Sequence, residues 1–428
     1  MTGTVITGRV MCFDASPFDV PPEASARVEE AVRVENGLIE AVGPKAQIQQ
    51  PGDTRMDMGA ALILPGFIDA HVHYPQTGII ASWGKRLRDW LETYTFPEEA
   101  RFGDALYAAK IAGQYLDLAL SHGTTTVASF CTSHPESVTA FFEAAQRRGM
   151  RVVAGKTCMD RNAPEALCDT PQRAYDESRA LIEAWRGRGR LSYAITPRFA
   201  PTSSPEQLEA LGTLWREYPS CLMQTHLSEQ TEEVAWVKAL YPKARDYLDV
   251  YETHGLLQER ALFGHAIHLT SRERDRLRTS GAALIHCPTS NLYIGSGLFD
   301  IGCALSEDQR VGLASDIGGG SNFGMLRTMA AAYDVAQLSG TVLHPAELLW
   351  LATGASAKAL HLSDRIGRIA PGMDADLVAL DVASTPAIAQ RSARANDIWE
   401  AIFPTIMMGD DRAVVGVWVA GRRTGFQS

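Results

Sequence analysis

The chain has 428 residues, of which 46% are hydrophobic and 21% are charged, and its formal net charge is −10. This composition is typical of a soluble globular protein with room for one large domain and an appendage, or for two or three ordinary domains. The acidic balance without a basic stripe argues against a nucleic-acid partner. No apolar run approaches the ~20 residues that a membrane span needs, so no membrane partner is expected either.

The cysteines and the first residues bear on the cellular compartment. Seven cysteines are widely scattered without a CxxC pair, which predicts neither a disulfide framework nor a cysteine zinc site. We expect most of these thiols to be buried. The first residues lack the basic and apolar regions of a signal peptide and are typical of a short strand. The expected location is cytoplasmic.

Both ends of the chain carry β-strand patterns. Near the start, "VRVENGLIEAVG" places Asn36 and Gly37 between two apolar runs, which is the strongest short-range signal of a hairpin. The last part of the chain has similar β-strand patterns in "DADLVALD" and in "AVVGVWVAGRR". In the second of these, Ala420 and Gly421 predict another tight turn.

Between these ends, eight short apolar runs alternate with helical patterns. The runs are "LILPGFIDAHVH", "GTTTVASF", "MRVVAGKTCM", "LSYAITPRF", "CLMQTHLSE", "ALFGHAIHL", "AALIHCPTSN" and "VGLASDIGG". Capping-box patterns begin at Ser204 and at Thr270, and Gly281 is a stop signal for the second of these helices. Eight strand-then-helix units predict a (β/α)8 barrel. The expected fold class is therefore α/β, with a TIM-type barrel over residues 66–372 and a small β-sandwich domain from residues 1–65 and 373–428.

One long stretch, roughly residues 76–100, shows no regular pattern and follows the first barrel strand. Long irregular loops within compact domains are often functional, so we predict a lid. The segment "WLETYTFPEEARF" (90–102) is expected to close over the bound substrate, and the alternative is a packed surface helix and loop.

Five residues at strand ends form a predicted metal site. His71 and His73 are two apart on one strand, so their imidazoles point to the same side. His226, His265 and Asp316 each end their own apolar run, and barrel enzymes assemble their sites at that end of the strands. Nitrogen and oxygen ligands without cysteine favour Zn²⁺, with Fe²⁺ as the alternative.

Two further histidines compete for a role at this site. His268 lies three residues after His265, and we prefer His265 because it directly ends its run. His286 also ends a run, and we expect it to act in catalysis as a hydrogen-bond donor beside the site. The alternative for His286 is a histidine packed in the core.

Several motifs together suggest a family. "PGFIDAHVH", "THLSE", "HCPTSNL", "SDIGGG" and "GRIAPGMDADLVALD" resemble the amidohydrolase superfamily, in its branch of single-metal deaminases and chlorohydrolases. Within it, "WLETYTFPEEARF", "GKTCMDRN" and "TPRFAPTSS" resemble the guanine deaminases, in the right order over nearly the whole chain. The resemblance implies hydrolysis of guanine to xanthine and ammonia by a homodimer. Two-metal barrels of this type carry a modified lysine after the fourth strand, but this chain has Arg198 there and Lys156 after the third strand. One metal ion per subunit is therefore expected.

The expected chemistry starts from a metal-bound water, whose pKa falls from 15.7 to about 7. Asp316 is expected to take its proton, with a pure ligand role as the alternative. Glu229 is expected to protonate N3 of the base and the leaving amine, and a solvated glutamate at a helix start is the alternative.

The residues expected to bind the substrate are Gln76, Arg198, Phe199, His226, Glu229 and Asp316. The fork of Arg198 matches the O6 and N7 acceptors of guanine, and Phe199 offers a ring for stacking. Gln76 is assigned to the ring or amino edge of the base. The alternative for Arg198 is an ion pair across the barrel mouth.

Other functions remain open from the sequence. A single-metal hydrolase of this kind could act on another aminopurine, a pterin or a chlorinated triazine, and a catalytically silent barrel could serve as a scaffold. The zinc site of other nucleobase deaminases, H-x-E followed by P-C-x-x-C, is excluded because the chain has no P-C-x-x-C.

Overall fold

The computed structural model describes residues 3–83 and 86–425. The chain divides into two compact units: the first comprises Met1–Asp69, Asp117–Thr126 and Phe323–Ser428, and the second comprises Ala70–Leu116 and Val127–Asn322. The strand predicted at the start of the chain is β1 (Thr4–Phe13), while residues 1 and 2 lie outside the described residues. The domain boundaries expected from the sequence remain a prediction.

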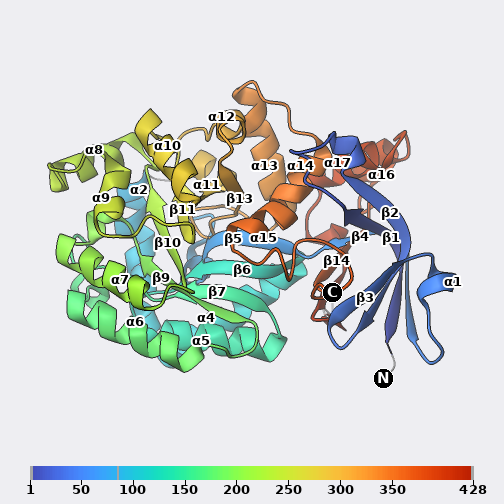
Figure 1. Cartoon of the computed structure of the whole chain (residues 1–428), viewed down its shortest axis with the longest axis horizontal. Coiled ribbons are helices and arrows are strands. Elements are labelled where there is room, and N and C mark those ends of the chain that lie inside the picture. The colour runs from blue at the N-terminus through green and yellow to red at the C-terminus, as the bar shows by residue number, and fades with distance from the viewer. Residues whose placement is uncertain (1–2, 84–85, 426–428) are drawn as a thin grey trace. The chain divides into compact units, whose positions relative to one another are not determined.

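Eight strands form the barrel sheet in the order β13-β12-β11-β10-β9-β7-β6-β5 (Figure 1). Their bounds are β5 (Phe67–His73), β6 (Thr124–Phe130), β7 (Arg151–Gly155), β9 (Leu191–Pro197), β10 (Leu222–Leu227), β11 (Ala261–His265), β12 (Ala283–His286) and β13 (Arg310–Leu313), and the short β8 (Thr157–Cys158) also pairs with β9. Each of the eight apolar runs contains or overlaps one of these strands, so the predicted barrel is confirmed.

Backbone hydrogen bonds tie the segment after the last strand to the first strand. The amide of Asp316 donates to the carbonyl of His71 at 3.0 Å, and the amide of His73 donates to the carbonyl of Ile317 at 2.5 Å. These bonds bring the ends of β13 and β5 together, as a barrel requires.

Helices follow the strands along the chain. The longer ones are α4 (Ala105–Ser121), α5 (Pro135–Arg148), α6 (Pro171–Trp185), α7 (Pro205–Glu217), α8 (Thr231–Leu240), α9 (Tyr247–Thr253), α10 (Ser271–Ser280), α13 (Met325–Leu338), α16 (Pro386–Ser392) and α17 (Ile398–Met408), and the shorter ones include α11 (Pro288–Tyr293), α12 (Ile301–Ser306), α14 (Pro345–Trp350) and α15 (Ser356–Ala359).

Both predicted helix starts are found. Thr270 and Glu273 form a complete capping box for α10, and Gly281 ends that helix with a left-handed φ of 73°. Ser204 caps α7 by accepting from the amide of Gln207 at 3.1 Å. The side chain of Gln207 makes no hydrogen bond among the described residues. Only one of the two hydrogen bonds of a capping box is therefore present at this helix start.

The two chain ends share one sheet, in the order β16-β15-β14-β4-β1-β2-β3. The bounds besides β1 are β2 (Ala26–Glu35), β3 (Leu38–Gly43), β4 (Thr54–Pro65), β14 (Leu377–Leu380), β15 (Val414–Val419) and β16 (Arg422–Arg423), and α1 (Lys45–Ile48) follows β3. Both predicted turns are confirmed, with positive φ at Asn36, Gly37, Ala420 and Gly421. The predicted small β domain thus consists of a single continuous sheet.

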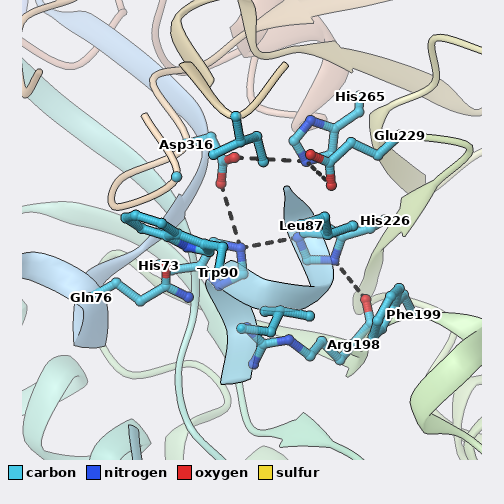
Figure 2. Close-up of a pocket in the computed structure, with 13 residues that line it drawn as sticks. His73, Gln76, Leu87, Trp90, Arg198, Phe199, His226, Glu229, His265 and Asp316 are labelled. Carbon is cyan, nitrogen blue, oxygen red and sulfur yellow. Dashed lines mark hydrogen bonds and ion pairs between the residues drawn. The ribbon is translucent and has the colours of Figure 1, made fainter. Parts of the chain in front are cut away.

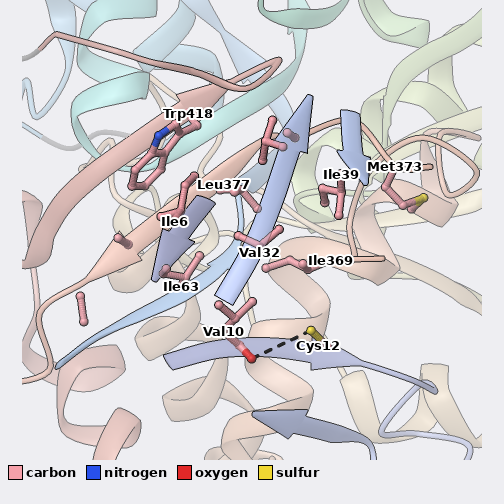
Figure 3. Close-up of a cluster of buried hydrophobic side chains, with 14 residues drawn as sticks. Ile6, Val10, Cys12, Val32, Ile39, Ile63, Ile369, Met373, Leu377 and Trp418 are labelled. Atoms are coloured by element: carbon pink, nitrogen blue, oxygen red, sulfur yellow. Dashed lines mark hydrogen bonds between the residues drawn. The ribbon is translucent and has the colours of Figure 1, made fainter. Parts of the chain in front are cut away.

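The strands of this sheet enclose an apolar cluster (Figure 3). Ile6, Val32 and Ile63 from the N-terminal strands meet Leu377 and Trp418 from the C-terminal strands, and each is completely buried. Burial of side chains from both ends of the chain is what holds the ends together.

The stretch predicted as irregular after the first strand is largely helical. It comprises η2 (Tyr74–Ile79), α2 (Leu87–Trp90), a π-helical turn η3 (Leu91–Thr95) and α3 (Phe96–Glu99), so the prediction of irregular structure is wrong over Leu87–Glu99. Pro97 cannot donate the regular helical hydrogen bond, and the wider π turn directly before it accommodates that loss. Two of the stretch's residues, 84 and 85, lie outside the described residues.

The expected burial of most cysteines is confirmed. All seven are free thiols, and five of them are buried. Among the helices of the described residues, none is both long and apolar enough for a membrane span.

Candidate active site

The five predicted metal ligands lie together at the ends of their strands, and all five are buried. Nε2 of His73 and Nε2 of His226 approach to 3.0 Å. Oδ1 of Asp316 is 3.5 Å from Nε2 of both His71 and His73, and Oδ2 is 3.7 Å from Nε2 of His265. The donor atoms of His71, His226 and His265 lie within 4.8 Å of one another, as do those of His71, His73 and Asp316. Strands β5, β10 and β11 and the segment after β13 therefore supply two donor sets that share His71.

The backbone at two of these residues is unusual. His265 has a φ of 66° and Asp316 a φ of 52°, which is the left-handed region that residues with a Cβ seldom adopt. Such conformations persist where the surrounding structure imposes them, and they concentrate at functional sites. Here they turn two side chains into the cluster at the point where β11 and β13 have ended.

Hydrogen bonds to Nδ1 determine which nitrogen two of the histidines present. Nδ1 of His226 donates to the carbonyl of Arg198 at 2.7 Å, and Nδ1 of His265 donates to Oδ1 of Asn291 at 2.8 Å. Because a carbonyl only accepts, Nδ1 carries the proton and the Nε2 lone pair faces the cluster. Metal-binding histidines show this arrangement.

The electrostatics of the cluster also fit a cation. Burial, then neighbouring histidines and Arg198, lower the pKa of His71 and His73, and burial with the charge of His265 lowers the pKa of His226. These rings are neutral and can coordinate. Nε2 of His71 is buried with no hydrogen-bond partner among the described residues, and a metal ion would satisfy it.

Two carboxylates flank His265, and Figure 2 shows Asp316 and Glu229 on either side of its ring. Burial lowers the pKa of His265, but the charges of Glu229 and Asp316, together with the hydrogen bond to Asn291 and the charge of Glu233, raise it overall. Burial raises the pKa of Asp316 to about 6. Oε2 of Glu229 lies 3.5 Å from Nε2 of His265, and Oε1 accepts from the hydroxyl of Ser296 at 2.7 Å.

An aromatic ring that the sequence analysis did not single out supports the cluster. Phe130, at the end of β6, has its centroid 4.8 Å from that of His71, 4.6 Å from His73 and 4.7 Å from His226. The sequence does place Phe130 at the end of an apolar run, but a phenylalanine at such a position is usually an ordinary core residue. It forms an apolar wall that restricts the rotation of three imidazoles.

A cavity opens beside the cluster. Its lining comprises His73, Gln76, Leu87, Trp90, Leu91, Arg198, Phe199, His226, Glu229, His265, Ile294, Asp316 and Gly319 (Figure 2). Leu87, Trp90 and Leu91 come from α2 and η3, so the segment predicted to be a lid does line the cavity. Their i, i+3, i+4 spacing places all three on one face of the helix. Trp90 is 2% exposed and its ring lies 6.2 Å from that of Tyr293.

The predicted substrate contacts meet a carboxylate that the sequence analysis missed. Glu99, at the end of α3, accepts from Nη1 of Arg198 at 2.6 Å and from Nε2 of Gln76 at 2.9 Å. Arg198 therefore makes the ion pair that was its alternative assignment and also lines the cavity. Phe199 lies beside it, with its ring 6.3 Å from that of His226.

The remaining histidines and the lysine lie outside the cavity lining. His268 is only partly buried and donates through Nε2 to the carbonyl of Ser296 at 2.9 Å. His286 stacks on Phe299 with centroids 4.7 Å apart, and burial lowers its pKa to about 3. This packing matches the core alternative, and a catalytic role for His286 remains a prediction. Lys156 is completely buried in an ion pair with Asp169, so it does not serve as a metal bridge.

Comparisons with known proteins cover most of the chain. The amidohydrolase family model matches residues 62–424. The guanine deaminase of Escherichia coli K12 is 44% identical over 392 residues, which cover 91% of this chain and 89% of that protein. The structure of E. coli guanine deaminase has a TM-score of 0.96 at 40% identity, covering 99% of this chain and 100% of that one.

One of the similar structures contains a bound ligand. The guanine deaminase of C. acetobutylicum, solved with guanine bound in its active site, has a TM-score of 0.89 at 28% identity and covers 99% of this chain and 100% of that chain. Because the family model spans most of the sequence and close relatives match nearly end to end, this chain belongs to the amidohydrolase family.

Proposed function

We propose that this protein catalyses the hydrolysis of guanine to xanthine and ammonia. The observation that carries the proposal is a single cavity in which the imidazole and carboxylate cluster faces Arg198, Gln76 and Phe199. A guanidinium fork, an amide and an aromatic ring are the groups that recognise a purine edge and face. The relatives that are at least 40% identical over most of the chain include the guanine deaminase of E. coli, by sequence and by structure.

One Zn²⁺ per subunit is the proposed cofactor, with Fe²⁺ as the alternative. His71, His73, His226, His265 and Asp316 would hold it, since they offer neutral nitrogen and carboxylate donors without a thiolate. The ion, when bound, lowers the pKa of a coordinated water toward about 7 and so makes hydroxide accessible at neutral pH.

The chain's own residues orient the base. Arg198 is proposed to donate to O6 and N7, and Gln76 to contact the ring or amino edge. Phe199 is 3% exposed and lines the same cavity, where its ring is proposed to pack against the purine face. Burial of all three side chains excludes water and strengthens each polar contact.

Proton transfer is assigned to the two carboxylates. Asp316 is proposed to take one proton from the attacking water, whose oxygen bonds to C2 of guanine. Asp316 is proposed to pass this proton to Glu229, which protonates N3. Glu229 is then proposed to take up the proton left on the C2 oxygen and to pass it to the departing nitrogen as the bond from C2 to the amino group breaks. Guanine and one water thus give xanthine and one ammonia, and both carboxylates return to their starting state.

Location and assembly complete the proposal. Seven free thiols without a disulfide support a reducing compartment, and we propose the cytoplasm. A homodimer is proposed from the resemblance to the guanine deaminases. Light scattering on a sizing column tests the dimer, because a mass near one chain would contradict it.

Release of ammonia, or of chloride from the triazine, tests the proposed reaction. The purified, metal-loaded protein is offered guanine, another aminopurine, a pterin and a chlorinated triazine at equal concentrations. We expect guanine to give the highest kcat/KM. Preference for another compound would assign the cavity to that substrate, and no release from any of them would favour a silent scaffold.

A further inference from the structure

Glu99 lies between the two polar side chains proposed to bind the base. It is 1% exposed, and each of its oxygens has its own donor: Oε1 accepts from Nε2 of Gln76 at 2.9 Å, and Oε2 accepts from Nη1 of Arg198 at 2.6 Å. Glu99 does not itself line the cavity. Among the described residues, the hydrogen bonds of this buried carboxylate go to two residues that do line the cavity. Glu99 is therefore placed to act through them.

We infer that Glu99 is a positioning residue that fixes the amide of Gln76 and the guanidinium of Arg198 in the orientation that binds the base. This inference rests on the proposed function and deepens it. An ionised carboxylate only accepts hydrogen bonds, so it requires a donor from each partner. That requirement turns the nitrogen of the Gln76 amide toward Glu99.

A second contact fixes the other end of the same amide. The backbone N–H of Gly318 lies 3.3 Å from Oε1 of Gln76 and donates to it. A Cβ at Gly318 would come within 2.7 Å of the carbonyl oxygen of Gln76, so the glycine permits this approach. The amide is held at both ends, which leaves its second N–H and the second lone pair of Oε1 for a ligand.

Glu99 also balances a charge. Arg198 is 3% exposed, and its guanidinium contributes to the lowered pKa of His71 and His73. An unpaired buried cation is costly, and removing one partner of such a pair leaves that cost uncompensated. The carboxylate of Glu99 keeps the guanidinium in place beside a cluster that itself would hold a cation.

The position of Glu99 in the fold links base recognition to the lid segment. Glu99 ends α3, which continues the helical stretch whose Leu87, Trp90 and Leu91 line the cavity. The guanidinium of Arg198 also lies over the ring of Phe96, at 5.6 Å from its centroid. One segment thus covers the cavity and orients its polar groups.

The substitution Glu99→Gln tests the inference at nearly constant volume. In the wild type, Gln76 and Arg198 donate to different oxygens of Glu99. A glutamine keeps only one of these two oxygens and has an NH₂ group in place of the other. If its oxygen stays with Arg198, its NH₂ faces the NH₂ of Gln76, which must turn over and lose the bond from Gly318. Either arrangement misorients one of the two proposed substrate contacts.

The matched control is Glu98→Gln on the same helix. Glu98 is 7% exposed and accepts from Nη1 of Arg101 at 2.9 Å, and it does not line the cavity. Both variants and the wild type are metal-loaded and compared by kcat, KM for guanine and melting temperature. Inhibition constants are measured for xanthine, which has O6, and for 2-hydroxypurine, which lacks it.

We expect Glu99→Gln to raise KM by about tenfold to a hundredfold, as loss of a charged hydrogen bond implies, and to change kcat by less than about threefold. Xanthine binding should weaken more than 2-hydroxypurine binding, and Glu98→Gln should leave KM and both inhibition constants unchanged. A purely structural role would instead lower the melting temperature and weaken both inhibitors alike.

The outcomes separate the two proposals. Wild-type kinetics in Glu99→Gln, or equal weakening of both inhibitors, overturns the role of Glu99 while guanine turnover by the wild type still stands. Equal effects from Glu98→Gln overturn it as well. A metal-loaded wild type that leaves guanine unchanged overturns the proposed function, and the inference with it.

Discussion

At the scale of single residues, Arg198 connects the cavity to the histidine cluster. Its carbonyl oxygen accepts from Nδ1 of His226 at 2.7 Å, while its guanidinium pairs with Glu99 at 2.6 Å. The backbone of one residue therefore sets a histidine tautomer, and its side chain faces the cavity. A substitution here changes the side-chain function alone, because the carbonyl is retained.

Arg198→Lys is predicted to reduce kcat/KM for guanine by about tenfold to a hundredfold. The reason is that the ammonium group of lysine cannot reproduce the paired N–H donors of the guanidinium. Steady-state kinetics measure the effect. Arg216→Lys is the control, since Arg216 bonds to Thr213 at 2.8 Å on the exposed surface. An unchanged kcat/KM in Arg198→Lys would remove the proposed contact to O6 and N7.

Glu229→Gln is predicted to lower kcat by about 10²-fold to 10⁴-fold, the usual contribution of general acid–base catalysis. Metal content should stay at the wild-type level, because Glu229 is not among the proposed ligands. Glu232→Gln is the control, since the exposed Glu232 pairs with Arg86 at 2.8 Å. A kcat within about tenfold of wild type would contradict the proton-transfer role.

At the scale of the elements, the site residues at the strand ends were predictable from the sequence. The residues that hold them in place were not. His71, His226 and Asp316 follow short apolar runs, a local pattern that also places them at one end of a barrel. Glu99, Asn291 and Ser296 reach the site from helices and loops. Polar residues there have the same pattern as surface residues, and only tertiary packing shows that they are buried.

Close packing between β5 and β11 leads to a prediction for Gly264. A Cβ at this position would lie 2.6 Å from Cε1 of His71, so Gly264→Ala must displace that ring. We expect less bound metal per chain by elemental analysis and a loss of about 1–3 kcal/mol in stability. Gly113→Ala is the control, because its nearest contact would be 3.7 Å, to Arg148. Full metal loading in Gly264→Ala would contradict this packing.

The start of α8 is predicted to be sensitive to pH. Glu233 accepts from the amides of Glu229 and Gln230 at 2.8 and 3.1 Å. Burial, then the charge of Glu229, raises its pKa from 4.5 to about 7. A raised folded pKa means that its contribution to stability is complete below about pH 4.5 and is lost as the pH rises through about 7.

Melting curves of the wild type and Glu233→Gln check the sign. The amide does not titrate, so the wild type's melting temperature relative to the variant should be higher at pH 5 than at pH 8. A constant difference would show that Glu233 does not titrate in this range. A difference that grows with pH would mean that its folded pKa is lowered.

At the scale of the whole molecule, the fold was predictable because the same pattern of an apolar run and a helix repeats along the chain. Eight runs with intervening helical patterns predicted the barrel, and the turns at Asn36-Gly37 and Ala420-Gly421 predicted the terminal hairpins. The helical form of Leu87–Glu99 was missed because Pro97 interrupts the helical pattern and because the segment combines α and π turns. A periodicity of 3.6 residues does not describe such a segment.

The central claim is that one metal ion, held by four imidazoles and Asp316, is required for guanine deamination. The most direct test follows the conversion of guanine to xanthine by ultraviolet absorbance after chelation, while Zn²⁺ is titrated back. We expect no turnover in the chelated protein and a linear recovery that ends at one equivalent per chain. Full activity without metal, or a recovery that needs two equivalents, would contradict it.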